Sequence, residues 1–303
     1  MPSRHTVLPQ QGLFLLAAIT LFWGLNWPVM KYSITQIPVL TFRTFCVSGA
    51  AAGLLLIARL NRLPLQVPSH QWGRLLVISL FNITGWNVFA LYGLTLLPSG
   101  RAAILAYTMP LWGIMLSTWL LGERFTARRA FGLGLGMCGM LLLMANELQA
   151  FGRAPMGAIM MLSAAMSWAV GTVLIKRYPV DMPTTAFTGW QLLLGGIPIV
   201  IGAAIFDPWP IQPIPLLPAL GLLYNIAFGF IFCYWAWYKV VAMVPVSISS
   251  IGSLMTPVVG VFSGMILLHE RPQWQEFAAL ALVIGALATV LLPAAPRRAP
   301  LSS

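Results

Sequence analysis

The stretch that decides the fold is LPSGRAAILAYTMPLWGIMLSTWLLGERFT, residues 97–126, because its pattern recurs in residues 244–272, VPVSISSIGSLMTPVVGVFSGMILLHERP. The first stretch contains Pro98, Pro110 and Glu123-Arg124, and the second contains Pro245, Pro257 and Glu270-Arg271. Each matching pair lies 147 positions apart. Prolines and a Glu-Arg pair are rare in apolar sequence, so the constant spacing indicates a duplicated half, as in secondary transporters.

The composition indicates an integral membrane protein. Hydrophobic residues make up 59% of the chain, charged residues only 8%, and the mean hydropathy is +0.87. A soluble domain carries about 25% charged residues, so this chain cannot cover a globule with polar surface. Its apolar runs are continuous and roughly 20 residues long, which suits membrane helices and not the alternating strands of an outer-membrane barrel.

Charged or Pro-rich breaks divide the chain into ten expected spans. They are 12–30, 39–58, 72–94, 100–121, 130–145, 156–175, 184–206, 216–238, 246–268 and 277–292, of which the fifth and tenth are short. The duplication divides the chain into a first five-helix repeat, residues 1–149, and a second, residues 150–303. Because five is an odd number, the second repeat enters the membrane upside down, and an inverted repeat provides alternating access.

The distribution of basic residues predicts the orientation. Ten spans place both termini on one side, which receives twelve of the 17 Lys and Arg residues: Arg4, Arg59, Arg62, Arg74, Arg124, Arg128, Arg129, Lys176, Arg177, Lys239, Arg297 and Arg298. The other side receives four, Lys31, Arg101, Arg153 and Arg271, and Arg43 lies within a span. By the positive-inside rule both termini are cytoplasmic, and the net charge of +11 needs no nucleic-acid partner.

Several function classes are excluded by what the spans lack. The three cysteines lie in apolar runs and the three histidines lie near loops or termini, so we expect neither a metal site nor a cofactor. No nucleophile and base, and no metal-binding motif, lie within the spans, which argues against an intramembrane enzyme. Neither rings of like charge nor a carbonyl-filter sequence occurs, which argues against an ion channel.

Several motifs resemble those of a known family. Phe22-Trp-Gly-Leu-Asn-Trp-Pro28, Leu121-Gly-Glu-Arg124 and Leu268-His-Glu-Arg271, in this order and duplicated, are similar to the EamA-type ten-helix branch of the drug/metabolite transporter superfamily. The many tryptophans in the spans resemble those of the YddG-like amino-acid exporters. That resemblance implies a helical bundle around a central cavity, with the fifth and tenth helices outside it. It also implies efflux of aromatic and other neutral amino acids across a bacterial inner membrane.

Rings and amides within the spans are the candidate substrate-binding residues, because together they suit an amphiphilic solute. Each ring also fits an interfacial belt or a core, and each amide also fits a hydrogen bond between helices. The predicted set is Trp23, Asn26, Trp27, Asn82, Trp86, Tyr107, Trp168, Trp190, Gln191, Asn225, Tyr234 and Trp237.

Charged and proline residues within the spans are the other candidates. Arg43 lies about five residues from the outer end of its span, where it either attracts a substrate carboxylate or snorkels to the interface. No carboxylate lies in the middle of a span, which disfavours a buried proton relay. Pro110 and Pro257 are predicted hinges, with a static kink as the alternative. We expect each Glu-Arg pair to hold its turn by local ion pairing.

The sequence therefore predicts an all-α secondary transporter that exports small amphiphilic metabolites, foremost aromatic and other neutral amino acids. The alternatives are a carrier of lipophilic cations, nucleoside-like solutes or sugar conjugates, and an importer. The expected partners are the substrate and membrane lipid, with a monomer favoured over a dimer. The sequence leaves open the substrate, the direction and the energy coupling.

Overall fold

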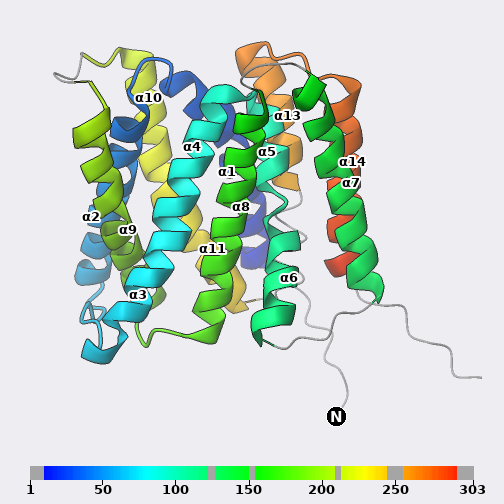
Figure 1. The fold of residues 1–303 in the computed structure, drawn as a ribbon. Coiled ribbons are helices and arrows are strands. Elements are labelled where there is room, and N and C mark those ends of the chain that lie inside the picture. Colours follow the sequence, from blue (N-terminus) through cyan, green and yellow to red (C-terminus); the bar gives the residue numbers. More distant parts are fainter. Residues whose placement is uncertain (1–9, 122–126, 150–153, 209–212, 244–254, 292–303) are drawn as a thin grey trace, which may run out of the picture.

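The computed structural model describes residues 10–121, 127–149, 154–208, 213–243 and 255–291, and the elements assigned there are all helices (Figure 1). From the first half come α1 (Gln10–Ser33), α2 (Val39–Leu60), α3 (Trp72–Ser79), α4 (Trp86–Leu96), α5 (Ser99–Ala106), α6 (Met109–Leu121) and α7 (Ala127–Gln149). From the second come α8 (Ala154–Arg177), α9 (Thr184–Phe206), α10 (Leu216–Tyr224), α11 (Cys233–Met243), α13 (Met255–Leu268) and α14 (Trp274–Leu291). A short 3-10 turn, η1 (Ser69–Gln71), precedes α3.

Among the described residues, six helical segments are long and apolar enough to cross a membrane. They are Gln10–Ser33, Val39–Leu60, Ser69–Leu96, Pro155–Arg177, Thr184–Phe206 and Leu216–Trp237. Shorter apolar helices lie within α7, α13 and α14. The described part of the chain is therefore that of a helical membrane protein.

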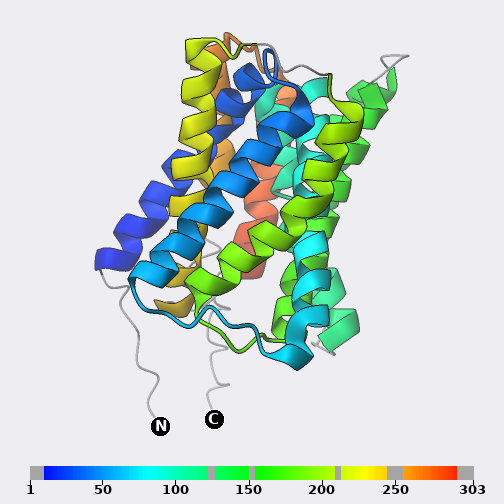
Figure 2. The ribbon, with the colours of Figure 1, turned by 90° about the vertical axis from the view of Figure 1, so that its left-hand side faces the viewer.

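The helices pack in pairs whose members are far apart in sequence. The closest pairs are α2 with α9, α7 with α14, α4 with α8, and α1 with α13. Figure 1 shows α2 and α9 at one edge of the bundle and α7 and α14 at the opposite edge, and in Figure 2 α2 and α9 run diagonally across the front. The first turn of α1 and the last turn of α14 lie at the same end of the bundle (Figure 1).

Two of the expected spans contain π-helical segments. Between α3 and α4 lies η2 (Leu80–Gly85), and between α10 and α11 lies η3 (Asn225–Phe232). In η2 the backbone N–H of Trp86 reaches back five residues to Phe81 O, so the face that the following residues present is shifted. Such segments are rare and occur frequently at functional sites.

The fourth expected span is divided. Its helix stops after Ala106 and resumes as α6 at Met109, so Pro110 lies in the first turn of a new helix and not inside a kinked one. Proline is well tolerated there because its missing N–H has no partner to lose. The fifth span is longer than expected, since α7 covers 23 residues.

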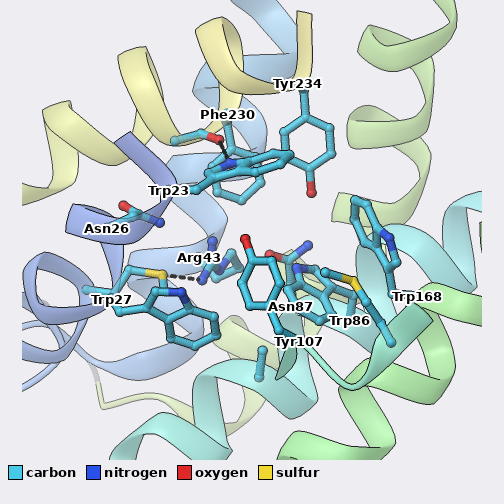
Figure 3. Close-up of a pocket in the computed structure, with 14 residues that line it drawn as sticks. Trp23, Asn26, Trp27, Arg43, Trp86, Asn87, Tyr107, Trp168, Phe230 and Tyr234 are labelled. Carbon is cyan, nitrogen blue, oxygen red and sulfur yellow. Dashed lines mark hydrogen bonds between the residues drawn. The ribbon is translucent and has the colours of Figure 1, made fainter. Parts of the chain in front are cut away.

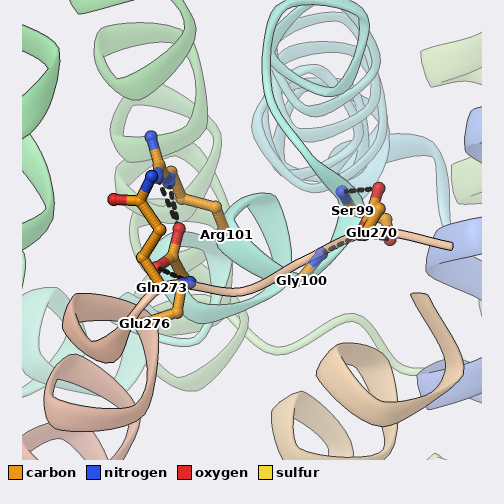
Figure 4. Close-up of polar contacts among 6 residues, drawn as sticks. All are labelled: Ser99, Gly100, Arg101, Glu270, Gln273 and Glu276. Carbon is orange, nitrogen blue, oxygen red and sulfur yellow. Dashed lines mark hydrogen bonds and ion pairs between the residues drawn. The ribbon is translucent and has the colours of Figure 1, made fainter. Parts of the chain in front are cut away.

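Carboxylates at the end of the bundle where α5 begins cap helices. Glu270 accepts hydrogen bonds from the Ser99 N–H and hydroxyl, both at 2.7 Å, and from the Gly100 N–H at 3.3 Å (Figure 4). Glu276 pairs with Arg101 and also accepts from the Gln273 N–H at 2.9 Å. The expected local pairing at Glu270-Arg271 is therefore wrong: Glu270 instead links α5 of the first half to the second half. The Glu123-Arg124 pair lies outside the described residues.

Candidate functional site

A cavity of about 80 Å³ lies in the middle of the bundle and is lined from both halves of the chain (Figure 3). Its walls come from α1, α2, α4, the α5–α6 junction, α6, α8, η3 and α11, and none of the lining residues belongs to α7 or α14. The lining residues are Trp23, Asn26, Trp27, Met30, Arg43, Trp86, Asn87, Ala90, Tyr107, Met109, Trp168, Gly229, Phe230 and Tyr234. Ligand pockets typically measure about 300–1,000 Å³, so a bound solute requires these side chains to move apart.

Aromatic rings form a continuous wall on one side of the cavity. The ring centroids of Trp86 and Trp168 lie 5.2 Å apart, those of Trp168 and Tyr234 lie 6.0 Å apart, and those of Tyr234 and Trp23 lie 6.1 Å apart. Phe230 stacks on Tyr234 at 5.4 Å. The Trp23 indole donates to Gly229 O at 3.0 Å, which ties α1 to η3. Such a wall offers flat apolar surface to a solute.

Arg43 is the one charged side chain among the lining residues. It is only 3% exposed, so it does not snorkel to the interface. Its guanidinium lies over the rings of Phe42 and Phe230, at 5.7 and 5.1 Å, and donates from Nη2 to Met30 Sδ at 3.2 Å. Among the described residues its Nε has no hydrogen-bond acceptor. A thioether is a weak acceptor, so this cation keeps donors without a strong protein partner among the described residues.

Asn87 is a lining residue that the sequence reasoning missed. It is buried, and its Nδ2 donates to Ile83 O at 2.7 Å. Figure 3 shows Asn87 among the residues that line the cavity together with Arg43, and the hydroxyl groups of Tyr107 and Tyr234 point toward the same space. An amide in the middle of a span was the available signal, but it did not distinguish Asn87 from Asn82.

The structure brings together eight of the thirteen predicted binding residues: Trp23, Asn26, Trp27, Arg43, Trp86, Tyr107, Trp168 and Tyr234. Besides Asn87, the reasoning missed Met30, Ala90, Met109, Gly229 and Phe230, whose apolar or backbone surfaces carry no signal that separates them from core.

The other five predicted residues lie outside the lining. Trp190 donates to Leu65 O at 2.8 Å and packs on Trp72, because the chain after α2 folds over the start of α9. Trp237 lies behind Trp23, 5.9 Å from its ring. The amides of Asn82, Gln191 and Asn225 are buried within η2, α9 and η3 respectively.

Of the two predicted hinge residues, Pro110 lies in the first turn of a helix that follows a break, and Pro257 lies near the first described residue of α13. Pro110 is the second residue of α6 and Pro257 the third of α13, and the residues directly before α13 lie outside the described ranges. Tyr107, at the break before α6, lines the cavity, so a movement of this junction would change the cavity wall.

The four carboxylates whose side chains the structure describes lie away from the cavity. Asp181 accepts from Gln71 Nε2 at 2.7 Å, Asp207 accepts from the Thr41 hydroxyl at 2.7 Å, and Glu270 and Glu276 cap α5 and α14. Within the described ranges no three His, Cys, Asp or Glu residues come together as a metal site requires. In the described part of the chain, Arg43 therefore faces no protein anion across the cavity.

This arrangement agrees with a comparison against protein families. The model of the EamA-like transporter family matches residues 10–145 and again residues 155–292. The chain belongs to this family.

Relatives and a solved structure extend this result. The transporter YoaV of Bacillus subtilis is 27% identical over 90% of this chain and 91% of its own length. A protein of Escherichia coli named "Probable amino-acid metabolite efflux pump" is 25% identical over 89% of this chain and 91% of its own length. A solved crystal structure shares the fold with a TM-score of 0.70 at 21% identity, and the match covers 97% of this chain and 100% of that one.

Proposed function

We propose that the chain is an exporter of aromatic and other neutral amino acids in the bacterial inner membrane. It works by alternating access between two inverted five-helix repeats, residues 1–149 and 150–303. In this arrangement each repeat spans the membrane five times, giving ten spans with both termini in the cytoplasm. The twofold match to the family model and the shared end of α1 and α14 support the proposal. A monomer suffices, because one chain lines the cavity.

Reciprocal contacts between the halves support the inverted repeat. Helix α1 packs against α13 and against the rod formed by α10, η3 and α11, while α8 packs against α6 and the rod formed by α3, η2 and α4. At η2, Asn82 lies against Gly171 of α8, and at η3, Gly229 lies against Asn26 of α1. These contacts are repeat-mates with the residues exchanged, since Gly229 follows Asn82 by 147 positions and Gly171 follows Asn26 by 145.

Arg43 is the observation that carries the choice of substrate. A buried cation with no anionic partner is costly in a membrane protein, and a substrate carboxylate supplies the missing charge through a charge-assisted, bidentate hydrogen bond. The aromatic wall then packs on the side chain of the same solute. A lipophilic cation would meet Arg43 as a like charge, so the electrostatics of the described cavity favour an amino acid over that alternative.

Counterflow in proteoliposomes tests the proposal. Vesicles loaded with unlabelled phenylalanine should accumulate labelled phenylalanine above the level of protein-free vesicles. Arg43→Gln should reduce the initial rate by about 10-fold or more, because a hydrogen bond to a charged group is worth roughly 1.5–3 kcal/mol. Arg43→Lys keeps the charge and should retain part of the rate.

The matched control is Arg59→Gln, which removes an exposed arginine from the other end of the same helix and should leave the rate unchanged. If the protein carries tetraphenylphosphonium but not phenylalanine, the amino-acid assignment is wrong. Equal phenylalanine rates for wild type and Arg43→Gln would remove the carboxylate role.

A further inference from the structure

We infer that Asn87 recognises the α-amino group of the substrate, so that Arg43 and Asn87 together select an α-amino acid over a simple carboxylate. The inference rests on the proposed function and adds the residue that determines substrate class. It follows from the way Asn87 is held, from its place in the cavity, and from the lack of any acidic side chain among the lining residues.

The π-helical segment fixes the direction of the Asn87 amide. At the end of η2 the Trp86 N–H bonds back to Phe81 O, and the side chain of the next residue, Asn87, donates from Nδ2 to Ile83 O at 2.7 Å. With the NH₂ group committed to the backbone, the amide oxygen Oδ1 is left as an acceptor. Asn87 is only 1% exposed, yet it lines the cavity, so this acceptor serves the cavity and not bulk solvent.

The surroundings of Asn87 suit an ammonium group next to a carboxylate. Asn87 and Arg43 line the same small cavity (Figure 3), as the two charged groups of an α-amino acid require. A substrate carboxylate on Arg43 brings its ammonium within the same region, where the amide oxygen accepts a hydrogen bond. The faces of Trp86 and Trp168 add cation–π attraction without a buried acid. A simple carboxylate leaves Oδ1 unpaired.

Three phenyl compounds of similar size distinguish the contribution of the substrate's amino group from that of its carboxylate. Phenylalanine carries both, 3-phenylpropionate lacks the amino group, and phenethylamine lacks the carboxylate. Initial uptake into preloaded proteoliposomes should favour phenylalanine over either analogue. Asn87→Leu, of similar volume, should lower the ratio of phenylalanine to 3-phenylpropionate uptake by about 10-fold or more, since a hydrogen bond to a charged group is lost. Uptake of 3-phenylpropionate itself should persist, which reports that the variant is folded.

Asn61→Ala is the matched control. Asn61 makes the same side-chain bond one turn back, from Nδ2 to Ile57 O at 2.8 Å, but it is exposed outside the cavity, so the uptake ratio should not change. An unchanged ratio in Asn87→Leu overturns the role of Asn87 while leaving the carrier function intact. Equal uptake of all three compounds by the wild type also overturns it. Uptake of none of them overturns both this inference and the proposed function.

Discussion

Gly171 of α8 lies so close to η2 that the addition of one methyl group should destabilise the fold. A Cβ at this position would lie 1.9 Å from Asn82 Oδ1, 2.5 Å from Asn82 Cγ and 3.1 Å from the Asn82 backbone nitrogen. Ordinary Cβ contacts are 3.4–4 Å, so the Asn82 side chain would have to move by more than 1 Å. Asn82 is 2% exposed, so its side chain is enclosed by protein and cannot move out into solvent.

The magnitude is the difference between two opposing effects. Overpacking a tight interior costs about 1–3 kcal/mol, whereas replacing a helical glycine by alanine gains roughly 0.5–1 kcal/mol. Gly171→Ala should therefore lose stability by up to about 2 kcal/mol. Gly134→Ala should be neutral or stabilising, because Gly134 lies inside α7 with nothing within 4 Å of its Cβ position.

Heating of detergent-solubilised protein, followed by the loss of the monodisperse elution peak, measures the effect. Asn82→Ala removes the atoms nearest to the added methyl group and should restore most of the stability of Gly171→Ala. On its own Asn82→Ala should cost less, since Oδ1 has no hydrogen-bond partner among the described residues. Two outcomes would refute the close approach of α8 and η2: an unfolding midpoint for Gly171→Ala equal to that of Gly134→Ala, or no rescue of Gly171→Ala by Asn82→Ala.

Two further predictions concern the link between the halves and the break before α6. Glu270→Gln removes the charge that caps α5, so it should lower the free energy of unfolding by about 1 kcal/mol and with it the thermal midpoint. Arg271→Gln, which changes the exposed neighbouring residue, should leave the midpoint unchanged. Equal midpoints for the two variants would contradict the capping role. Pro110→Ala and Pro257→Ala should each slow counterflow without reducing membrane insertion, because Pro110 follows the break between α5 and α6 and Pro257 is its mate in the second repeat. Pro198→Ala, inside the continuous helix α9, serves as the control, and unchanged rates in the first two variants would exclude hinges.

Some of the site follows from the sequence because burial of charge in a membrane is so costly. Arg43 was a candidate on that ground alone, and its place in the cavity at 3% exposure argues against snorkelling, while attraction of a carboxylate stays a prediction. The tryptophans of the first and sixth spans, Trp23 and Trp168, were likewise candidates by depth. Trp190 was a candidate on the same ground, but its indole donates to Leu65 O in the loop after α2, outside the cavity.

The choice between Asn82 and Asn87 shows where such prediction ends. Both amides lie in the same apolar run, and periodicity cannot tell which one faces the cavity when a π-helical segment shifts the helix between them. The break at Tyr107 and Thr108 was likewise not predictable, because the sequence shows where the proline lies but not where the helix before it ends.

The sequence by itself determined that the chain is a helical membrane protein of a transporter family, because apolar length, scarce charge and recurring motifs are properties of the chain. Only the tertiary structure decided which polar side chains meet. The helices that pair most closely, such as α2 with α9 and α1 with α13, come from opposite halves, and local helical pattern does not specify such contacts. The cavity around Arg43 and Asn87 exists because packing between the halves brings seven helical elements and the α5–α6 junction together.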